Sequence, residues 1–384
     1  MSRVPESGSA EAPKRIPQLD GLRGLAILLV VLLHYFANTA RGQQPLVFKY
    51  FARAFGMGWA GVDLFFVLSG FLIGGILLDA RPSKRYFSTF YLRRIHRIFP
   101  LYYLWLVLFG LFLFLGFTVG GSPLAFSRLD LSHFPRYLVF VQNFFYQKGP
   151  LEIHWLSQTW SLAVEEQFYL VAPLLIRFLS VRRLTQVLLC TILLAPVLRF
   201  FVFGYMDHGF VYAVMSMPCR ADDLAMGILA AVAIRSAWFP AFLARHPRFL
   251  SKVFLCAALG MCGWIWWLMH PMSLPSVTLG LSWLGFFWLS LMLVVLCEPA
   301  GWIARIFRWG FLQRAGVLSY CIYIAHSSLN EILHRALRHD THRMDDWKGF
   351  LVTASAALLV WLVASVSWKY FENPLLQRGR RYSY

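Results

Sequence analysis

The sequence is short of charged residues, and of acidic residues in particular. Only 14% of its 384 residues are charged and 59% are hydrophobic, whereas soluble domains carry about 25% charged and roughly 45–50% apolar residues. This composition excludes an ordinary soluble enzyme and also an intrinsically disordered chain. Asp and Glu number 18 against 36 Lys and Arg. In so apolar a chain this excess indicates basic loops facing anionic lipid, so we expect membrane lipid and no nucleic acid as partner.

The sequence also lacks paired cysteines and grouped metal ligands. Its six cysteines are scattered, mostly within apolar runs, and none forms a Cys-x-x-Cys motif or a Cys/His group with metal spacing. We therefore predict no disulfide framework and no metal site. The cysteines are interpreted as small buried apolar side chains.

Long apolar runs are abundant, and the mean hydropathy is +0.58. Runs of about 20 apolar residues are long enough to cross a bilayer. They predict spans near residues 21–39, 58–78, 98–118, 155–178, 184–203, 216–234, 251–269, 277–297, 314–334 and 349–370. We therefore expect an all-α, polytopic membrane helix bundle of about ten transmembrane helices over residues 17–376. It would lie between a disordered tail (1–16) and a basic tail (377–384), both cytoplasmic.

The distribution of basic residues supports this topology. If the N-terminus is cytoplasmic, the inside segments hold nearly twice as many Lys and Arg residues as the outside segments, as the positive-inside rule requires. Arg199 and Arg220 count as outside residues in this scheme. The first apolar run resembles a secretory signal, but it contains Arg23 and His34 and has no clear cleavage site. We interpret it as a retained helix.

Arg23 and His34 are polar residues inside the first predicted span. They are eleven residues apart, close to three helical turns and a rise of ~16 Å, so both face one side of the helix. Ionisable residues inside a membrane helix are costly and mark functional sites. Alternatively, Arg23 extends to the interface and His34 is a hydrogen-bonded core histidine.

The fourth predicted span contains two adjacent glutamates, Glu165 and Glu166. Consecutive helical positions differ by ~100°, so both carboxylates cannot face lipid cheaply. Ser161 and Glu165 are spaced i,i+4 and share a face. A buried carboxylate here could orient an imidazole or relay its proton. The alternative is a buried ion pair with an arginine of another helix.

A basic cluster lies at the start of the third predicted span. Arg93, Arg94 and Arg97 would gather on one side of a helical turn. Guanidinium groups hold phosphates through bidentate hydrogen bonds, so this cluster is a candidate phosphate site. Anchoring at the membrane surface is an equally good interpretation.

Several further polar residues are weaker candidates for a supporting role. They are Asp63, Arg220, Asp222, Ser319, Tyr320, His326 and Glu372. Each has a simpler structural interpretation, in which Asp63 caps a helix end and Arg220 pairs with Asp222. In the same way, His326 would be a satisfied core histidine and Glu372 would lie at the end of a helix.

Together these segments resemble the acyltransferase-3 family of integral-membrane acyltransferases, from about Gly21 to Pro374. The matching segments are Arg23-x10-His34, VDLFFVLSGFLI from Val62, Arg93-Arg94-x-x-Arg97, WSLAVEEQFY from Trp160, Arg220-x-Asp222-x-Leu224-x-x-Gly227, and Ser319 to His326. Cys321 stands where the family usually has a small polar residue, and Ser327 where it often has a proline.

The resemblance implies O-acyl transfer, usually of acetyl, from cytoplasmic acyl-CoA to a hydroxyl of a cell-envelope carbohydrate or lipid-linked glycan. The protein would be a multi-pass protein of the inner or plasma membrane. Acyl-CoA, with acetyl-CoA the expected form, would be a co-substrate, and no permanently bound cofactor is expected. Some family members carry a fused extracytoplasmic hydrolase-like domain. This chain ends ten residues after Pro374, so we expect direct transfer or completion by a separate protein.

The resemblance also implies residue roles. The implied donor-binding residues are Arg23, Arg93, Arg94 and Arg97. His34 would be the general base or a transient acyl carrier, and Glu165, with Glu166 as second choice, would orient it. Two other classes stay open. In a proton-coupled transporter or lipid flippase the same His, Glu and Arg residues would move protons and bind an anion, and in a structural or sensory membrane protein they would only pair with each other.

Overall fold

The computed structural model describes residues 16–37, 46–114, 118–119, 122–123, 134–145, 155–268, 273–338 and 346–384. Within these ranges the chain is almost entirely helical, which confirms the predicted all-α class. The exception is a pair of two-residue antiparallel strands, β1 (Thr118–Val119) and β2 (Ser122–Pro123). The predicted N-terminal tail lies outside the described residues except for Ile16.

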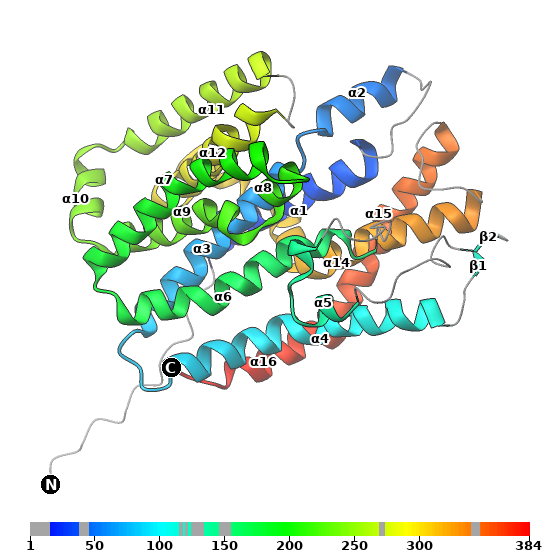
Figure 1. Cartoon of the computed structure of the whole chain (residues 1–384), viewed down its shortest axis with the longest axis horizontal. Helices are drawn as coiled ribbons and strands as arrows, with labels where there is room; N and C mark the ends of the chain where they lie inside the picture. Colours follow the sequence, from blue (N-terminus) through cyan, green and yellow to red (C-terminus); the bar gives the residue numbers. More distant parts are fainter. Residues whose placement is uncertain are drawn as a thin grey trace, which may run out of the picture.

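Long helices lie side by side and form the body of the molecule (Figure 1). They are α1 (Pro17–Leu32), α3 (Ala60–Ala80), α4 (Tyr86–Phe114), α6 (Trp160–Phe178), α7 (Val181–Tyr205), α9 (Met217–Arg235), α11 (Phe249–Leu268), α12 (Leu281–Cys297), α14 (Gly310–Arg338) and α15 (Trp347–Ser367). Each predicted span falls on one of these helices.

Six helical segments of the described chain are long and apolar enough to cross a membrane. A seventh is added if the helical segment Gly209–Arg235, which comprises α8 and α9, is counted with the short helix α10 (Trp238–Arg245) as one broken span. The two parts are bent by 80°. Helix α6 is 19 residues long but carries Glu165, Glu166 and Arg177. The multi-pass membrane class is supported, whereas the number of about ten spans is not confirmed.

Shorter elements connect the long helices. They are α2 (Leu46–Phe55), α5 (Pro135–Leu138), α8 (Gly209–Met215), α13 (Trp302–Ile306), α16 (Asn373–Arg380) and the 3-10 turns η3 (Gln142–Phe144) and η4 (Ser157–Thr159). Three further turns, η1 (Leu33–Ala37), η5 (Ser276–Gly280) and η6 (Trp368–Glu372), are π-helical. Such turns interrupt the regular α-helical register and are frequent at functional sites.

Segments assigned to the cytoplasmic side by the charge count lie together at one end of the bundle. Arg235 at the end of α9 forms two 2.7 Å hydrogen bonds with Asp79 at the end of α3. Arg81 donates to the backbone carbonyl of Leu179, and Arg177 donates to the carbonyl of Arg81. The turns after α3, α6 and α9 are therefore neighbours, as the alternating topology requires.

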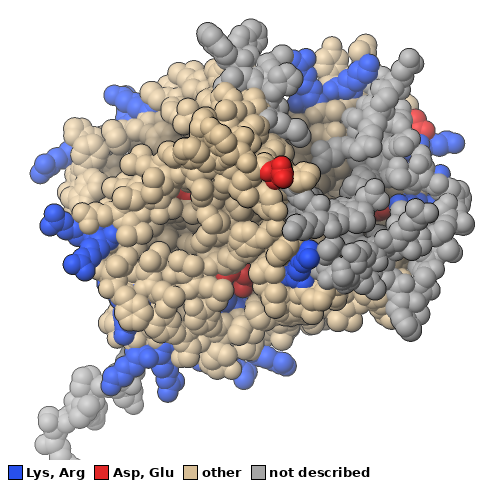
Figure 2. Space-filling view, in the orientation of Figure 1, with Lys and Arg blue, Asp and Glu red and all other residues tan. Residues whose placement is uncertain are grey.

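The opposite end of the bundle is joined by aromatic contacts. The rings of Phe36 and Phe350 lie 6.3 Å apart, and those of Phe48 and Trp347 lie 5.2 Å apart. These contacts bring η1, α2 and the start of α15 together. Figure 2 shows a broad surface with few charged side chains, and most of the Lys and Arg residues visible in this view lie near its rim, as expected for a bundle embedded in lipid.

Glycines allow two helix pairs to approach closely. A Cβ atom on Gly24 of α1 would collide with the backbone carbonyl of Leu312, and one on Gly316 of α14 would collide with that of Asp20. Gly70 of α3 and Gly227 of α9 are constrained in the same way by each other's helix. Small residues at such interfaces are typical of membrane bundles, where close packing rather than water exclusion holds helices together.

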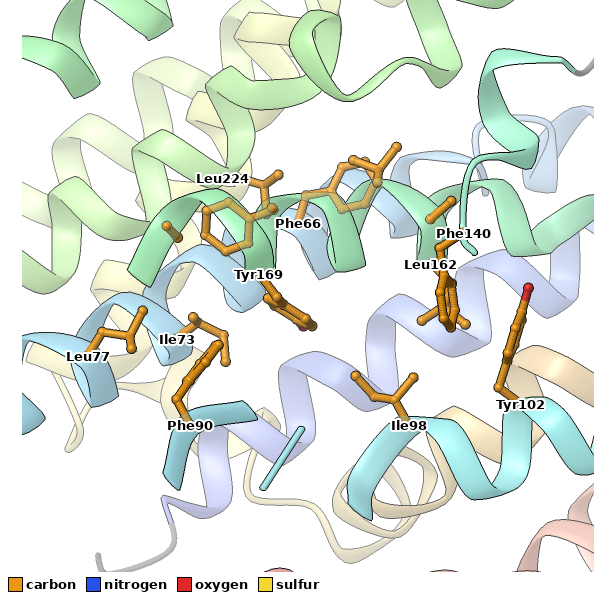
Figure 3. Packing of buried hydrophobic residues seen from close by; sticks show 14 of the residues in the cluster. Phe66, Ile73, Leu77, Phe90, Ile98, Tyr102, Phe140, Leu162, Tyr169 and Leu224 are labelled. Atoms are coloured by element: carbon orange, nitrogen blue, oxygen red, sulfur yellow. The ribbon is translucent and has the colours of Figure 1, made fainter. Parts of the chain in front are cut away.

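The largest buried apolar cluster lies between α3, α4, α6 and α9. Phe66, Phe90, Leu162 and Leu224 contribute to it from these four helices (Figure 3). Tyr169 of α6 points into the same cluster, but its hydroxyl makes polar contacts. The apolar core thus ends at the polar interior described next.

Candidate active site

His34 lies where α1 gives way to the π-helical turn η1. The first span is α-helical only to Leu32, so the regular spacing expected between Arg23 and His34 is interrupted. The Nδ1 atom of His34 lies 2.8 Å from the backbone oxygen of Val30. Because a carbonyl only accepts, Nδ1 carries the proton of the neutral ring and Nε2 carries the lone pair. A base at this position therefore acts through Nε2.

A second histidine, His326 of α14, lies directly against His34. The two ring centroids are 4.9 Å apart, with an angle of 67° between the ring planes. His326 is fully buried, and Tyr35, the neighbour of His34, donates a 2.9 Å hydrogen bond to the backbone oxygen of His326. His326 is thus a buried, hydrogen-bonded histidine, as its simpler interpretation expected, and it also contacts His34.

Charged side chains from α1, α4, α6 and η6 form a cluster around Arg23, on the N-terminal side of His34 along α1. We call Arg23, Arg94, Arg97, Glu165, Glu166 and Glu372 the Arg/Glu cluster, because each lies within electrostatic range of other members. The six formal charges balance. Glu372, which the sequence offered as a helix end, is placed here by the turn η6 and accepts a 3.0 Å hydrogen bond from Ser367.

The arginines and glutamates of the Arg/Glu cluster do not form ion pairs with one another. Among the described residues, no ion pair within 4.0 Å joins any of its arginines to any of its glutamates. The buried Nε atom of Arg94 and the buried Oε1 atom of Glu166 make no hydrogen bond. Unsatisfied buried polar atoms are rare in folded proteins and call for a ligand or water. The cluster is therefore organised to receive a polar group.

Glu165 is oriented by a tyrosine. The hydroxyl of Tyr169 donates a 3.1 Å hydrogen bond to Glu165 and lies 2.8 Å from the hydroxyl of Ser69. The charged neighbours of Glu165 are Arg23, Arg94 and Arg97. The predicted hydrogen bond between a glutamate and His34 is not formed in the described part of the chain. Glu165 thus belongs with the arginines, and Ser69 is hydrogen-bonded to the tyrosine that orients it.

The three arginines of α4 were expected to gather on one side of the helix, but they do not form one cluster. Arg94 and Arg97 join the Arg/Glu cluster, and the guanidinium of Arg94 lies 5.9 Å from the ring centre of Tyr169. Arg93 instead donates a 2.8 Å hydrogen bond to the backbone oxygen of Tyr382 and covers the ring of Tyr384 at 4.9 Å. At ~100° per residue, side chains 93 and 94 point in different directions, and only one side of α4 faces the interior.

The C-terminal segment occupies the other side of α4. Helix α16 packs along α4, and Thr89 donates a 2.9 Å hydrogen bond to the backbone oxygen of Ser383. A Cβ atom on Gly379 would lie 2.9 Å from the Cβ of His96. The predicted basic tail (377–384) is therefore folded onto the bundle, and it holds Arg93 away from the Arg/Glu cluster.

Polar residues of α6 and α14 tie these two helices together. The hydroxyls of Ser161 and Tyr323 lie 2.5 Å apart, and Tyr323 also lies within 2.7 Å of the backbone oxygen of Gln158. Tyr320 donates a 2.7 Å hydrogen bond to the backbone oxygen of Ile98, and Ser319 is buried. Ser161 therefore contacts α14 and not Glu165, although the two share a helix.

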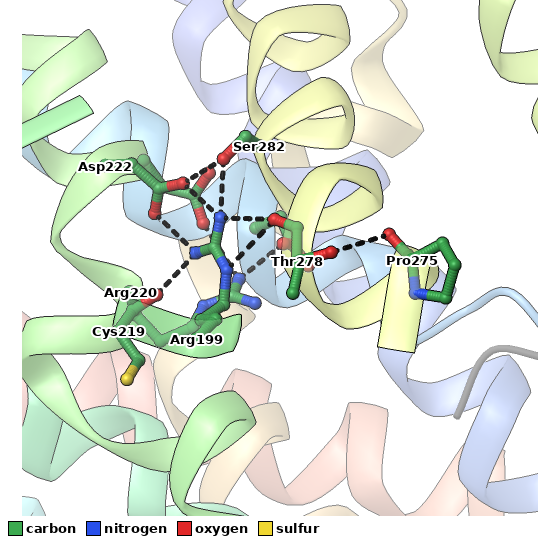
Figure 4. A network of polar contacts seen from close by, with 9 residues as sticks. Arg199, Cys219, Arg220, Asp222, Pro275, Thr278 and Ser282 are labelled. Carbon is green, nitrogen blue, oxygen red and sulfur yellow. Dashed lines mark hydrogen bonds and ion pairs between the residues drawn. The ribbon is translucent and has the colours of Figure 1, made fainter. Parts of the chain in front are cut away.

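A second buried charged network lies away from His34 (Figure 4). Arg220 binds Asp63 and lies 2.8 Å from Asp223, while Asp222 lies 2.8 Å from Arg199. The suggested pairing of Arg220 with Asp222 is wrong, because residues two apart on a helix point to different sides. Asp63 is an ion-pair partner and not simply a cap.

Arg199 belongs to this network but was not among the candidate residues predicted from the sequence. The charge count assigns it to an outside segment, whereas its side chain is fully buried in α7. It donates to the backbone oxygen of Thr278 at 3.0 Å, and Ser282 donates a 2.6 Å hydrogen bond to Asp222. Its position inside the apolar run 184–203 was a usable signal, because buried arginines in such runs need a partner.

Comparison with known proteins agrees with this architecture. The family described as "Acyltransferase domain" (Acyl_transf_3) matches residues 16–369. The peptidoglycan O-acetyltransferase OatA of Listeria monocytogenes is 26% identical over 384 residues, covering 95% of this chain and 56% of that protein. The putative peptidoglycan O-acetyltransferase YrhL of Bacillus subtilis is 27% identical over 396 residues, with the same shares covered. The O-acetyltransferase OatA of Staphylococcus aureus is 24% identical over 387 residues, covering 96% and 58%.

The chain therefore spans little more than half the length of these relatives. No solved structure matches the chain. The family match covers most of the sequence, including His34, His326 and every member of the Arg/Glu cluster except Glu372, and it confirms the resemblance inferred from the motifs. This chain belongs to the acyltransferase-3 family of membrane acyltransferases.

Proposed function

We propose that this protein transfers an acyl group, with acetyl as the expected one, from cytoplasmic acyl-CoA to a hydroxyl of a cell-envelope carbohydrate. The observation that carries the proposal is that Arg23, a member of the Arg/Glu cluster whose arginines and glutamates form no ion pairs with one another, shares one helix with His34, α1 and its extension η1. The names of the relatives favour a peptidoglycan-like acceptor. The protein would act in the inner or plasma membrane.

The Arg/Glu cluster is suited to the donor side of this reaction. The phosphates of CoA are anionic, and guanidinium groups bind phosphate oxygens through paired, charge-assisted hydrogen bonds. Arg94 and Arg97 lie at the cytoplasmic half of α4 by the charge count, and Arg23 lies near the same end of α1. The glutamates offset the arginine charge when no donor is bound, which lowers the cost of keeping three cations in an apolar bundle.

His34 is suited to the chemical step. Its Nε2 atom would accept the proton of the acceptor hydroxyl while the hydroxyl oxygen attacks the thioester carbonyl. The C–S bond then breaks, the thiolate of CoA leaves, and it takes up the proton from His34. In the covalent variant, Nε2 attacks the thioester carbonyl first, the C–S bond breaks and the thiolate of CoA leaves. The acceptor hydroxyl then attacks the acyl-histidine, the bond from Nε2 to the acyl carbon breaks, and the hydroxyl proton neutralises the thiolate. Both routes give the same ester and CoA.

The proposal is tested with the purified full chain in lipid nanodiscs. Labelled acetyl-CoA and peptidoglycan fragments are supplied, and CoA release and label transfer to the glycan are both measured. We expect transfer by the wild type and a loss of about 10²–10⁴-fold in His34→Ala, the range of a general base. The exposed His246 provides the control variant His246→Ala, which should keep full activity. Equal activity of His34→Ala and wild type would contradict the role of His34.

A second experiment, with the chain in proteoliposomes, addresses the transporter alternative. A proton-coupled transporter or flippase would move an anionic substrate across proteoliposomes without forming a labelled ester. Transport without acyl transfer by the wild type would overturn the proposed reaction.

A further inference from the structure

We propose that His326 is a positioning residue for His34, and that the two imidazoles work as one unit that takes up a single proton. The inference deepens the proposed function, because it assigns a partner to the proposed base. It starts from the edge-to-face contact of the two rings, whose centroids are 4.9 Å apart. These histidines come from η1 and α14, near opposite ends of the sequence.

The backbone fixes the protonation pattern of His326. Its Nδ1 atom lies 2.8 Å from the backbone oxygen of Tyr323 and 3.1 Å from that of Ile322. Both oxygens can only accept, so the proton of the neutral ring stays on Nδ1. The Nε2 atom lies 3.2 Å from the hydroxyl of Ser327, which can donate to it. In its neutral form, His326 is therefore held in one tautomer and one orientation.

This arrangement decides where an added proton goes. His326 is fully buried, and a second positive charge so close to a protonated His34 would be strongly repelled in an apolar bundle. The proton removed from the acceptor therefore resides on His34. A His326 ring packed against His34 keeps the His34 ring in one orientation while it carries this proton. Holding a catalytic group in the productive orientation lowers the barrier of the chemical step and not merely the free energy of binding.

The chain holds the two rings together from both sides. Tyr35, next to His34 in η1, donates to the backbone oxygen of His326, and its ring lies 6.2 Å from the His326 ring. The ring of Tyr323 lies 6.1 Å from that of His326, one helical turn away on α14. Two successive residues of η1 thus both contact α14. A turn that carries the proposed base is fixed against the helix that carries its partner.

The test compares His326→Asn with a matched control on the same helix. An Asn side chain can keep a donor near the position of Nδ1, so the bonds to the α14 backbone are retained while the ring is removed. The control is His334→Gln, because His334 is also a fully buried histidine of α14 and lies 2.9 Å from the hydroxyl of Thr353. Acyl transfer from acetyl-CoA is measured in nanodiscs for each variant.

We expect His326→Asn to lower kcat by about 10²-fold or more, within the range of general-base catalysis, with the KM for acetyl-CoA unchanged. His334→Gln should stay within about twofold of the wild type, because His334 lies about two helical turns from His326 on α14 and contacts Thr353 rather than His34. In the His34→Ala background, His326→Asn should cause no further loss, because residues that act as a unit are not additive.

Three results would overturn the inference. These are a kcat of His326→Asn close to that of the wild type, a rise in KM that accounts for its whole loss, or a further loss in the His34→Ala background. If His326→Asn does not accumulate, His326→Gln is measured against the same three criteria. Full activity of His34→Ala would instead contradict the proposed function, so the two failures are distinguishable.

Discussion

Individual charged residues in this bundle are distinguished by what each side chain meets. Arg93 and Arg97 are one helical turn apart on α4, yet Arg97 lies among Arg23, Arg94 and Glu165 while Arg93 binds the C-terminal segment. A buried cation needs a compensating group or a ligand, whereas a cation at the surface is stabilised by water and backbone oxygens. The same residue type therefore has two functions within one motif.

This difference predicts separate effects on donor binding. Arg97→Gln removes a charge from the Arg/Glu cluster and should raise the KM for acetyl-CoA by about 10–100-fold, the range for one charge-assisted hydrogen bond. Arg93→Gln should change that KM by about threefold at most, since surface charges contribute little. Steady-state kinetics in nanodiscs measure both values. If Arg93→Gln raised the KM for acetyl-CoA more than Arg97→Gln, the donor would bind at the outer side of α4 and not in the Arg/Glu cluster.

At the scale of elements, two features determine where the site forms. Glycines bring α1 against α14, and the π-helical turn η1 then presents His34 and Tyr35 to His326. Close backbone approach at Gly24 and Gly316 is a condition for this geometry, because the ring contact depends on the distance between the two helices. The helix pair is therefore both a structural unit and the support of the proposed base.

The role of the α1–α14 contact is tested by adding one methyl group. Gly24→Ala places a Cβ against the backbone of Leu312 and should lower the free energy of unfolding by about 1–3 kcal/mol, the usual cost of overpacking. Gly110→Ala on α4 is the matched control, because a Cβ there meets nothing within 4 Å. Thermal unfolding in detergent gives the comparison. Equal stability of the two variants would mean that α1 and α14 can separate without cost.

At the scale of the whole molecule, a buried ion network connects four helices. Asp63 of α3, Arg199 of α7, Asp222 of α9 and Ser282 of α12 come together with Arg220 and Asp223. In a membrane bundle the hydrophobic effect contributes little to helix association, so such contacts specify which helices are neighbours. The two polar regions differ, because the arginines of the network form ion pairs with its aspartates, whereas the arginines and glutamates of the Arg/Glu cluster form none with one another.

Removing one member of the network should destabilise the whole bundle. Arg199→Met leaves the carboxylate of Asp222 without its buried partner, and breaking a buried pair in this way costs about 3–5 kcal/mol. Arg199→Met with Asp222→Asn should recover part of that loss, because the uncompensated charge is also removed. Arg235→Met breaks the exposed pair with Asp79 and should cost about 1 kcal/mol at most. A single variant no less stable than the double variant would contradict this account.

Hydropathy and motif spacing predict the helical class, the approximate positions of the long helices and most residues of the polar interior. These are local properties, so Arg23, His34, the adjacent glutamates and the arginines of α4 can be found without a structure. The number of about ten spans is not confirmed in the same way, because a helix such as α6 carries Glu165, Glu166 and Arg177 and is not among the apolar helices of the described chain.

Which of these residues meet depends on how the helices pack. The contact between His34 and His326, the pairing of Arg199 with Asp222 and the loss of Arg93 to the C-terminal segment each join distant parts of the chain. Tyr35 and His326, which are 291 residues apart, are hydrogen-bonded because two glycine-lined helices pack closely. Partners of this kind depend on helix packing and on π-helical turns, and neither is encoded in the hydropathy of a single segment.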